Sequence, residues 1–363
     1  MGRWSILLLL AWSACSASAG GDHEVVRTGP LLDRRGQLRE PGWARRQLLA
    51  WNPAVLAPDA ALRQWDFVAL QDEANAVNIT LFDLGFVQLG SVSLIDLATS
   101  EKRESSTVRL SQSDAFELSA ALDGDARFQL DGALRPALAM KTTRDATTTT
   151  LTVEIAIDTP LSGPPATASL QATRPGAMEY LSLATPFADE PQQFFFEQKV
   201  PGLRASGTVT VGDRTATFVD APAVIDWGRG VWPDAVTWRW AAASGVVDGK
   251  TIALNLGEGF GDDRHGTENM VVVDGKLHKL GRVGWQFDAA VRTTPWQFVD
   301  GAGQVSLQLQ PAGEETGGLD FGDRYSRLSK IYGVWSGTIT LEDGTALALD
   351  GLRGFAEQMQ LAW

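Results

Sequence analysis

Short runs of alternating apolar and polar residues, joined by tight glycine turns, constrain the fold of this chain more than any other feature. Residues 147–159 read TTTTLTVEIAIDT, and every second residue from Leu151 to Ile157 is apolar. That period of two is typical of a strand with one buried face. Three other runs contain a glycine next to an aspartate, a pair that is typical of a hairpin turn. These pairs are Gly212-Asp213, Asp274-Gly275 and Asp343-Gly344. The sequence therefore predicts an all-β fold with antiparallel strands.

Helical periodicity is scarce along the chain. The best helical candidates are three short segments, Asp59–Gln64, Ser111–Glu117 and Asp320–Lys330. Repeated strand-turn units without crossover helices argue against a parallel α/β sheet and favour an antiparallel sandwich or barrel. We therefore expect few helices, all of them short.

The distribution of tryptophan divides the chain into two parts. No tryptophan lies between Trp65 and Trp227, whereas eight of the eleven outside the first twenty residues lie at or after Trp227. We place a domain boundary near Ala221–Ile225, which predicts β domains over residues 59–222 and 223–363, each of ordinary domain size. Residues 20–58 are rich in arginine and interrupted by Gly-Pro and Pro-Gly pairs, so we expect an extended arm whose basic side chains contact acidic surface of its own domain.

The first twenty residues are typical of an export signal. Arg3 precedes the apolar run Ser5–Trp12, which is too short to span a bilayer, and Ala17-Ser18-Ala19 fits a signal-peptidase site that would remove residues 1–19. Cys15 is the only cysteine, and it allows an alternative in which a lipoprotein signal is cleaved before Cys15 and the thiol is acylated. Both alternatives predict a periplasmic or cell-envelope protein, and the second adds a membrane tether.

Composition excludes several classes of function. The chain has 44 acidic and 31 basic residues, a net charge of −13, so it lacks the basic footprint of a nucleic-acid binder. It contains no phosphate-binding loop, no dinucleotide fingerprint and no nucleophile elbow. The acidic and histidine residues of the segment 257–279 match no zinc or calcium spacing. We therefore expect neither a cofactor nor a metal.

The segment 225–245 is the densest in residues that could carry chemistry. Asp226 is followed by four tryptophans within fourteen residues, and Trp238 and Trp240 share one face of a strand. A tryptophan-lined pocket that holds one carboxyl suits an apolar ligand, because burial keeps the acid protonated and indole rings stabilise a developing cation. The predicted ligand-binding residues are Trp227, Arg229, Trp232, Trp238, Trp240 and Asn269. In the structural alternative, Asp226 and Arg229 form an ordinary buried ion pair and the tryptophans belong to the core.

Glu268 and His278 are the candidate partners of Asp226 in acid–base chemistry. Asp226 would donate the proton, and Glu268 or His278 would activate water or return the proton. His278 follows a hairpin turn between Leu277 and Leu280 and could equally be a structural strand histidine.

The segments Asp226–Pro233 (DWGRGVWP) and Trp238–Ala241 (WRWA) resemble those of a bacterial family, domain-of-unknown-function family 2804. The resemblance extends from Gly29 to the closing Gly354–Glu357 (GFAE). The chain is more distantly similar to tandem calycin-like proteins, including the carotenoid hydratases and the tocopherol-cyclase-like group. That similarity implies an all-β fold of two consecutive calycin, or lipocalin-like, antiparallel barrels with few short helices. It also implies protonation of an alkene by an aspartate beside tryptophans, and Asp226 beside Trp227 is the matching position.

Three hypotheses of function remain open. The first is a binding or carrier protein that holds an apolar or amphiphilic small molecule, such as a lipid or isoprenoid, in a tryptophan-lined barrel pocket. The second is a cofactor-free hydratase, isomerase or cyclase that acts on a prenyl-type alkene with Asp226 as the general acid. The third is a structural envelope protein without a ligand.

Overall fold

The computed structural model describes residues 22–109, 116–129, 137–145, 147–188, 190–320 and 322–362. The predicted signal peptide over residues 1–19 and the possible acylation site at Cys15 lie outside these residues. Within the described part of the chain, the helical content is one 3-10 turn, η1 (Pro53–Val55). No helix there is long and apolar enough to cross a membrane.

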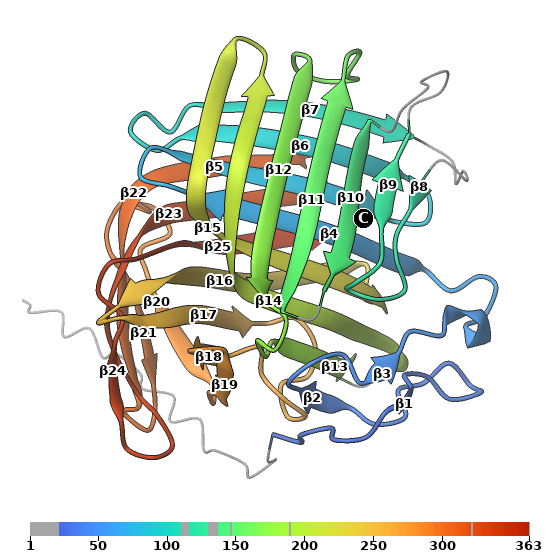
Figure 1. Ribbon diagram of the computed structural model, residues 1–363. Coiled ribbons are helices and arrows are strands. Elements are labelled where there is room, and N and C mark those ends of the chain that lie inside the picture. The colour runs from blue at the N-terminus through green and yellow to red at the C-terminus, as the bar shows by residue number, and fades with distance from the viewer. Residues whose placement is uncertain are drawn as a thin grey trace, which may run out of the picture.

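Thirteen described strands form the first sheet, most of which lies in the upper part of Figure 1, with β2 and β13 below. They run β2 (Gly42–Ala44), β4 (Leu62–Gln71), β5 (Asn75–Asp83), β6 (Gln88–Asp96), β7 (Lys102–Arg109), β8 (Phe116–Glu117), β9 (Ala126–Phe128), β10 (Leu138–Arg144), β11 (Thr148–Ile157), β12 (Ala166–Pro175), β13 (Leu181–Phe187), β14 (Glu190–Val211) and β15 (Arg214–Val231). The order is β7-β6-β5-β4-β15-β14-β12-β11-β10-β9-β8, and β13 joins β14 to β2. In Figure 1, β10 to β12 cross in front of β5 to β7, so the sheet curls back over itself.

Ten described strands form the second sheet, at the lower left of Figure 1. They are β16 (Ala235–Val247), β17 (Lys250–Glu258), β18 (Met270–Val273), β19 (Lys276–Lys279), β20 (Val283–Gln286), β21 (Trp296–Asp300), β22 (Val305–Asp320), β23 (Tyr325–Thr340), β24 (Ala346–Ala348) and β25 (Leu352–Ala362). The order is β19-β18-β17-β16-β25-β23-β22-β21-β20, with β24 paired to β23. A further short pair, β1 (Gly29–Pro30) with β3 (Leu49–Ala50), lies in the arm.

Each sheet curls around an apolar core of its own. The first core contains Phe128, Ile157 and Val209, all fully buried. The second contains Trp296 and Trp335, also fully buried. All pairs within the two sheets are antiparallel, and each sheet has the curled form of a half barrel, so the predicted all-β fold with two calycin-like barrels is confirmed.

The predicted hairpin turns are confirmed. Gly212-Asp213 joins β14 to β15, and Asp274-Gly275 joins β18 to β19 with φ values of +49° and +85°. Two positive φ values are what a type I′ turn requires. A turn is coded by adjacent residues, so the sequence alone suffices to locate it.

The predicted helices are wrong wherever the structure describes them. Leu62 begins strand β4 inside the segment 59–64, and of the segment 320–330 Asp320 ends β22 and Tyr325–Lys330 lie in β23. Of Ser111–Glu117 only the last two residues are described, and they form β8. Pairing with neighbouring strands overrides the weak helical periodicity of these short segments.

The two sheets divide between Val231, the last residue of β15, and Ala235, the first of β16. The predicted division between residues 222 and 223 falls inside β15, a strand that pairs with β14 and β4 of the first sheet.

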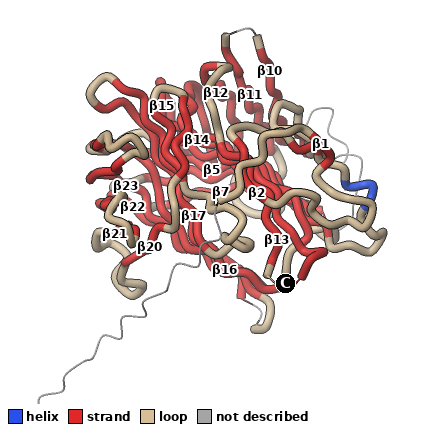
Figure 2. Tube along the Cα trace, turned by 90° about the horizontal axis from the view of Figure 1, so that it is seen from below, coloured by secondary structure: helices blue, strands red, loops and turns tan. Residues whose placement is uncertain are grey.

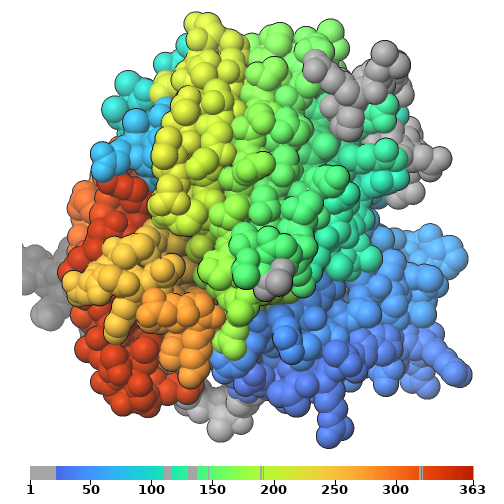
Figure 3. Space-filling model, viewed as in Figure 1, coloured from blue at the N-terminus to red at the C-terminus, as the bar shows by residue number. Residues whose placement is uncertain are grey.

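The arginine-rich arm packs below the first sheet, beside the second (Figures 1 and 3). Its strand β2 pairs with β13, and η1 lies at the outer edge of the arm, seen from below in Figure 2. Arg45 donates to Glu24, to Glu179 and to the Leu277 carbonyl oxygen. The arm therefore contacts both sheets.

Candidate functional site between the two sheets

The outer faces of the two sheets pack against each other, and strand register decides which side chains meet there. Lys199 of β14 lies opposite Asp226 of β15, which lies opposite Phe67 of β4. Residues directly opposite each other share a face of the sheet, so these three point the same way. From the second sheet, Trp240 of β16 meets them, with its ring centre 4.3 Å from the Lys199 Nζ and 5.7 Å from the Phe67 ring.

Three carboxyl groups surround the Lys199 ammonium in this interface. The Lys199 Nζ lies 3.1 Å from a Glu197 oxygen, 3.0 Å from an Asp226 oxygen and 3.5 Å from a Glu268 oxygen. All four side chains are at most 8% exposed. We call Glu197, Lys199, Asp226 and Glu268 the lysine–carboxylate cluster. Three acids facing one base without solvent cannot all be ionised at low cost.

The protonation states follow from burial and mutual repulsion. Burial raises the pKa of Glu197 well above its usual value, and the nearby Glu268 charge raises it further. Burial also raises the pKa of Glu268. Burial alone would lower the pKa of Lys199, but the three carboxyl groups outweigh it and raise that pKa. These shifts favour an ammonium at Lys199 and a protonated carboxyl at Glu197, the acid whose pKa is raised well above its usual value.

Trp240 is fixed in place over this cluster by an amide. Its Nε1 donates to the Asn255 Oδ1 at 2.8 Å, and the Asn255 Nδ2 donates to the Glu268 backbone oxygen at 2.8 Å. Asn255 is fully buried. The indole face is thus held toward Lys199, and the backbone that carries Glu268 is tied to the same amide.

Asn269 and Gly257 shape the backbone around Glu268. The Asn269 Oδ1 accepts a hydrogen bond from the Gly257 N–H at 2.8 Å, and the Asn269 Nδ2 donates to the Gly281 oxygen. A Cβ on Gly257 would lie 2.4 Å from the Glu268 Oε2, well inside van der Waals contact. Only glycine at this position leaves room for the Glu268 carboxyl.

Aromatic rings occupy the interface on one side of the cluster. Phe195 lies two residues before Glu197 on β14, and Trp238 lies two residues before Trp240 on β16. Phe260 is their centre, with ring-centroid distances of 4.4 Å to Phe195, 5.5 Å to Trp232 and 5.2 Å to Trp238. Trp65 joins the group 5.0 Å from Trp232. The rings meet edge to face, the arrangement that aromatic quadrupoles favour.

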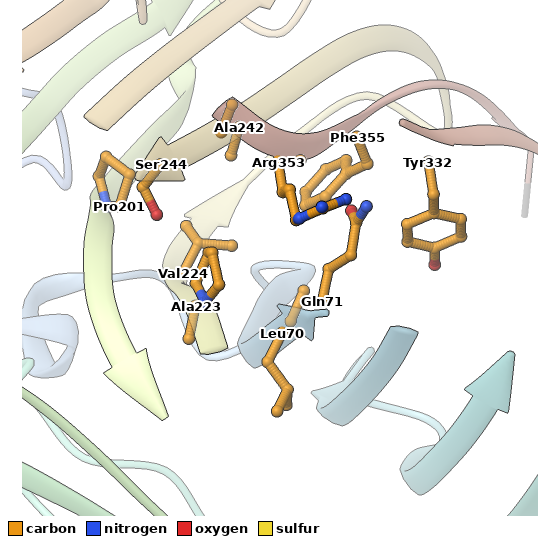
Figure 4. A pocket seen from close by; sticks show the side chains of 14 residues that line it. Leu70, Gln71, Pro201, Ala223, Val224, Ala242, Ser244, Tyr332, Arg353 and Phe355 are labelled. Atoms are coloured by element: carbon orange, nitrogen blue, oxygen red, sulfur yellow. The ribbon is translucent and has the colours of Figure 1, made fainter. Parts of the chain in front are cut away.

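A narrow groove lies on the other side of the cluster (Figure 4). Pro201, Val224 and Ala242 line it, each two residues along its strand from Lys199, Asp226 and Trp240 respectively. Gln71, Ser244, Tyr332 and Arg353 supply its polar groups. Its volume is about 20 Å³, roughly the space of one water molecule.

The family of the chain follows from comparison of its sequence with family profiles. The profile described as domain of unknown function DUF2804 matches residues 22–363, nearly the whole chain. The chain belongs to the DUF2804 family. No curated protein sequence matches it.

Solved structures relate this DUF2804 protein to other folds of two calycin-like barrels. A protein from Nitrosomonas europaea assigned as an AttH is 14% identical, with a TM-score of 0.51 over 84% of this chain and 93% of that one. Kievitone hydratase from Nectria haematococca is 12% identical, with a TM-score of 0.44 over 93% and 96%. CghA bound to Sch210972 is 14% identical, with a TM-score of 0.49 over 84% and 88%. At these identities the likeness to the AttH protein concerns the fold alone.

The predicted site residues of this DUF2804 protein divide between the two faces of β15. Asp226, Glu268, Trp240 and Asn269 come together at the interface, and Trp232 and Trp238 belong to the adjacent aromatic group. Trp227 and Arg229 lie on the opposite face of β15, where Trp227 packs with arm residues such as Leu31 and Trp51 and the guanidinium lies 4.0 Å from the indole ring centre.

Arg229 pairs with Asp66 rather than with Asp226. The Arg229 Nη2 lies 2.8 Å from the Asp66 Oδ1, and its other donors bind the backbone oxygens of Trp65, Gly228 and Ser119. Burial raises the pKa of Asp66 and lowers that of Arg229, with the mutual attraction opposing both shifts. The structural alternative of an Asp226–Arg229 ion pair is therefore wrong, since Asp226 pairs with Lys199.

His278 lies in a different part of the molecule. It lines a cavity of about 340 Å³ at the end of the second sheet, together with Trp43 of the arm and residues 340–342. None of the four residues of the lysine–carboxylate cluster lines that cavity. His278 is thus not placed to exchange a proton with Asp226.

Sequence reasoning missed Glu197 and Lys199, yet a signal for them exists. The hairpin turn at residues 212–213 is flanked by Val211 and Arg214, and Lys199 and Asp226 each lie twelve residues from these ends. Two irregularities in the pairing of β14 with β15, at Pro201/Leu203 and Ala205/Gly207, shift the register in opposite directions and cancel. Extending the predicted hairpin would have placed the lysine opposite the aspartate.

A second buried polar group, also missed, lies near Trp240, with the Lys330 Nζ 5.8 Å from its ring centre. Lys330 pairs with Glu357 at 3.0 Å and approaches the Asn78 Oδ1 at 3.3 Å. Tyr332 donates to the Glu315 Oε2 at 2.8 Å. Burial, with the nearby Glu315, raises the pKa of Tyr332 well above its usual value. Within the described residues, no group of three or more histidine, cysteine, aspartate and glutamate side chains is placed to hold a metal ion.

Proposed function

We propose that this DUF2804 protein acts on an apolar small molecule as a cofactor-free hydratase, isomerase or cyclase, and that the two sheets move apart to admit it, since the groove beside the cluster has room for about one water molecule. The observation that carries the proposal is the carboxyl of Glu197, which is fully buried beside Lys199 and whose pKa burial raises well above its usual value. A buried acid that stays protonated at neutral pH is the group that protonation of an alkene requires. Perturbed acids gathered in one place are also typical of functional sites.

Each member of the cluster has a role in this chemistry. The Glu197 O–H bond breaks as its proton forms a C–H bond with one alkene carbon, which leaves a carbocation on the other. The face of Trp240 stabilises that cation. In a hydration, water adds to the cation and loses a proton to Asp226 or Glu268; in an isomerisation, the cation itself loses the proton. Return of that proton to Glu197 restores the acid.

The roles differ from those expected from the sequence, in which Asp226 donates the proton and Glu268 or His278 accepts it. Asp226 is the carboxylate that pairs with Lys199 at 3.0 Å, which suits a proton acceptor. Glu197 lies opposite Gly228 of β15. Because glycine has no side chain, the Trp65 ring fills the space beside Gly228. We therefore assign the donor role to Glu197 and the acceptor role to Asp226 and Glu268.

The chemistry is tested by exchange with solvent deuterium. Purified protein is incubated in deuterium oxide with prenyl-type alkenes of several lengths, and the recovered alkenes are examined by mass spectrometry. We expect deuterium uptake or a mass gain of one water with the native protein, and at least a hundredfold loss in Glu197→Gln and Asp226→Asn. Glu258→Gln, at an exposed glutamate paired with Arg239, is the matched control. Equal rates in Glu197→Gln and the native protein would overturn the assignment.

A second candidate function, binding or carriage of an amphiphilic molecule without reaction, is favoured by the 340 Å³ cavity beside Trp43. That volume lies within the range of small-molecule pockets. Native mass spectrometry of protein purified from its own cells, followed by lipid extraction, tests it. A retained lipid or isoprenoid, with no deuterium exchange, would favour the carrier. A ligand-free mass, with neither exchange nor uptake of added isoprenoids, would leave only a structural role.

We also propose export to the periplasm or cell envelope, on the strength of residues 1–20. The mass of the mature protein is the test. Cleavage after Ala19 predicts a chain that starts at Gly20, whereas a lipoprotein signal predicts a chain that starts at an acylated Cys15. A mature chain that keeps Met1–Ala19 would overturn the proposal.

A further inference from the structure

The cavity of about 340 Å³ at the end of the second sheet contains a buried lysine that the proposed function does not use. The cavity lies between the arm and the second sheet, and Lys279, at the end of β19, lines it. Trp43 and Leu341 give it an apolar wall, and His278 and Glu342 supply titratable groups. Trp43 is 4% exposed, and its indole N–H is buried without a hydrogen-bond partner among the described residues.

Lys279 is held in a defined position in the wall of this cavity. Its side chain is 6% exposed. Its Nζ donates to the Thr267 Oγ1 at 2.5 Å and to the Leu280 backbone oxygen at 3.0 Å, and lies 3.3 Å from Asp22. The charged and titratable groups around it are Asp22 of the arm, Glu268 of the loop before β18, and His278 and Glu342 of the cavity wall.

These surroundings shift the protonation equilibrium of Lys279 toward the neutral amine. Burial lowers the pKa of Lys279 to about 8, although Asp22 and Glu268 oppose the shift. About half of this side chain is then a free amine at pH 8, compared with roughly 0.3% for a lysine of ordinary pKa. A desolvated lysine of this kind is the nucleophile that proteins use on carbonyl compounds.

We propose that the cavity binds an aldehyde or ketone with an apolar tail, and that Lys279 forms a reversible imine with it. The Nζ lone pair attacks the carbonyl carbon, the N–C bond forms as the C=O π bond breaks, the oxygen takes up a proton and the nitrogen loses one. The hydroxyl takes up a second proton and leaves as water while the nitrogen lone pair forms the C=N bond, and loss of the second N–H proton gives the imine. His278 and Glu342 line the same cavity and can carry the protons. Amine and carbonyl together become imine and water, so no oxidant or reductant is consumed.

Trapping of the imine by reduction tests this proposal. The full chain is incubated with hexanal and cyanoborohydride at pH 8 and at pH 6, and modified lysines are located by peptide mass mapping. Lys276 is the internal control, because it lies on the same strand and is exposed. We expect at least tenfold more modification at Lys279 than at Lys276 at pH 8. We also expect the yield at Lys279 to saturate with hexanal concentration, as binding before reaction requires.

Two variants keep the test independent of folding. Lys279→Arg retains the positive charge and removes the amine, so it should lose the saturable modification. Lys276→Arg should retain it. Modification spread evenly over the exposed lysines, or a linear dependence on hexanal at Lys279, would overturn the proposal. These outcomes do not depend on Glu197, so this proposal and the proposed function can fail separately.

Discussion

At the scale of single residues, Glu197 makes the strongest prediction. A carboxyl whose pKa is raised by folding binds more protons in the folded state, so the free energy of unfolding falls as pH rises above its unfolded pKa of about 4.5. The loss can reach about 1.4 kcal/mol per pH unit for one proton. Glu197→Gln keeps the shape of the side chain without the ionisation. Urea unfolding at pH 5, 6, 7 and 8 should therefore show a shallower decline in the variant and greater stability than the native protein at pH 8.

Some pH dependence should remain in Glu197→Gln, because burial raises the pKa of Glu268 and of Asp66 in the same direction. Glu258→Gln is the matched control, and it should keep the native slope. A variant as steep as the native protein, or less stable at pH 8, would contradict a neutral Glu197.

The candidate site could be predicted only in part, and the reason is visible at single residues. Asp226 stands out because tryptophans surround it in the sequence, whereas Glu197 and Lys199 stand in FFFEQKV, a strand segment without a motif. Their importance comes from what they face: Trp240 and Glu268 reach them from another sheet. Contacts between residues far apart in the sequence depend on how two sheets pack, which periodicity does not encode.

At the scale of elements, the close approach of β17 to the loop before β18 makes the next prediction. Gly257→Ala would place a methyl group 2.4 Å from the Glu268 Oε2, so the buried carboxyl must move away from Lys199. Overpacking of this kind costs about 1–3 kcal/mol. We expect thermal unfolding at a clearly lower temperature than that of the native protein. Gly301→Ala is the control, since nothing lies within 4 Å of its added carbon. Equal losses in the two variants would mean that contact with Glu268 is unimportant.

Elements also show which sequence signals can be trusted. The turns at residues 212–213 and 274–275 depend on adjacent residues alone, and both were predicted. The segment 320–330 has a weak helical period, yet Asp320 of β22 pairs with Tyr325 of β23, and Lys330 pairs with Glu315. Short helical patterns carry little free energy by themselves, so strand pairing decides their conformation.

At the scale of the whole molecule, the interface joins two sheets that could otherwise be separate domains. Each sheet has its own core, but β14 and β15 face β16 across a layer that contains the lysine–carboxylate cluster and the aromatic group around Phe260. Aromatic and charged groups buried in this layer would be exposed if one sheet unfolded alone. Opening the interface therefore costs free energy to both sheets, and unfolding should be cooperative.

Lys199→Met tests this coupling, because it removes the cation shared by carboxyl groups of both sheets. Breaking a buried ion pair from one side typically costs about 3–5 kcal/mol, since the remaining charges stay buried. We expect calorimetry to show one transition in both proteins, at a much lower temperature in the variant. The loss should shrink at pH 5, where protonation of the carboxyl groups relieves their repulsion. Lys250→Met, at the exposed first residue of β17, should leave the transition unchanged. Two separate transitions in the native protein, or a loss in Lys199→Met that does not depend on pH, would show that the sheets are stabilised independently of the cluster.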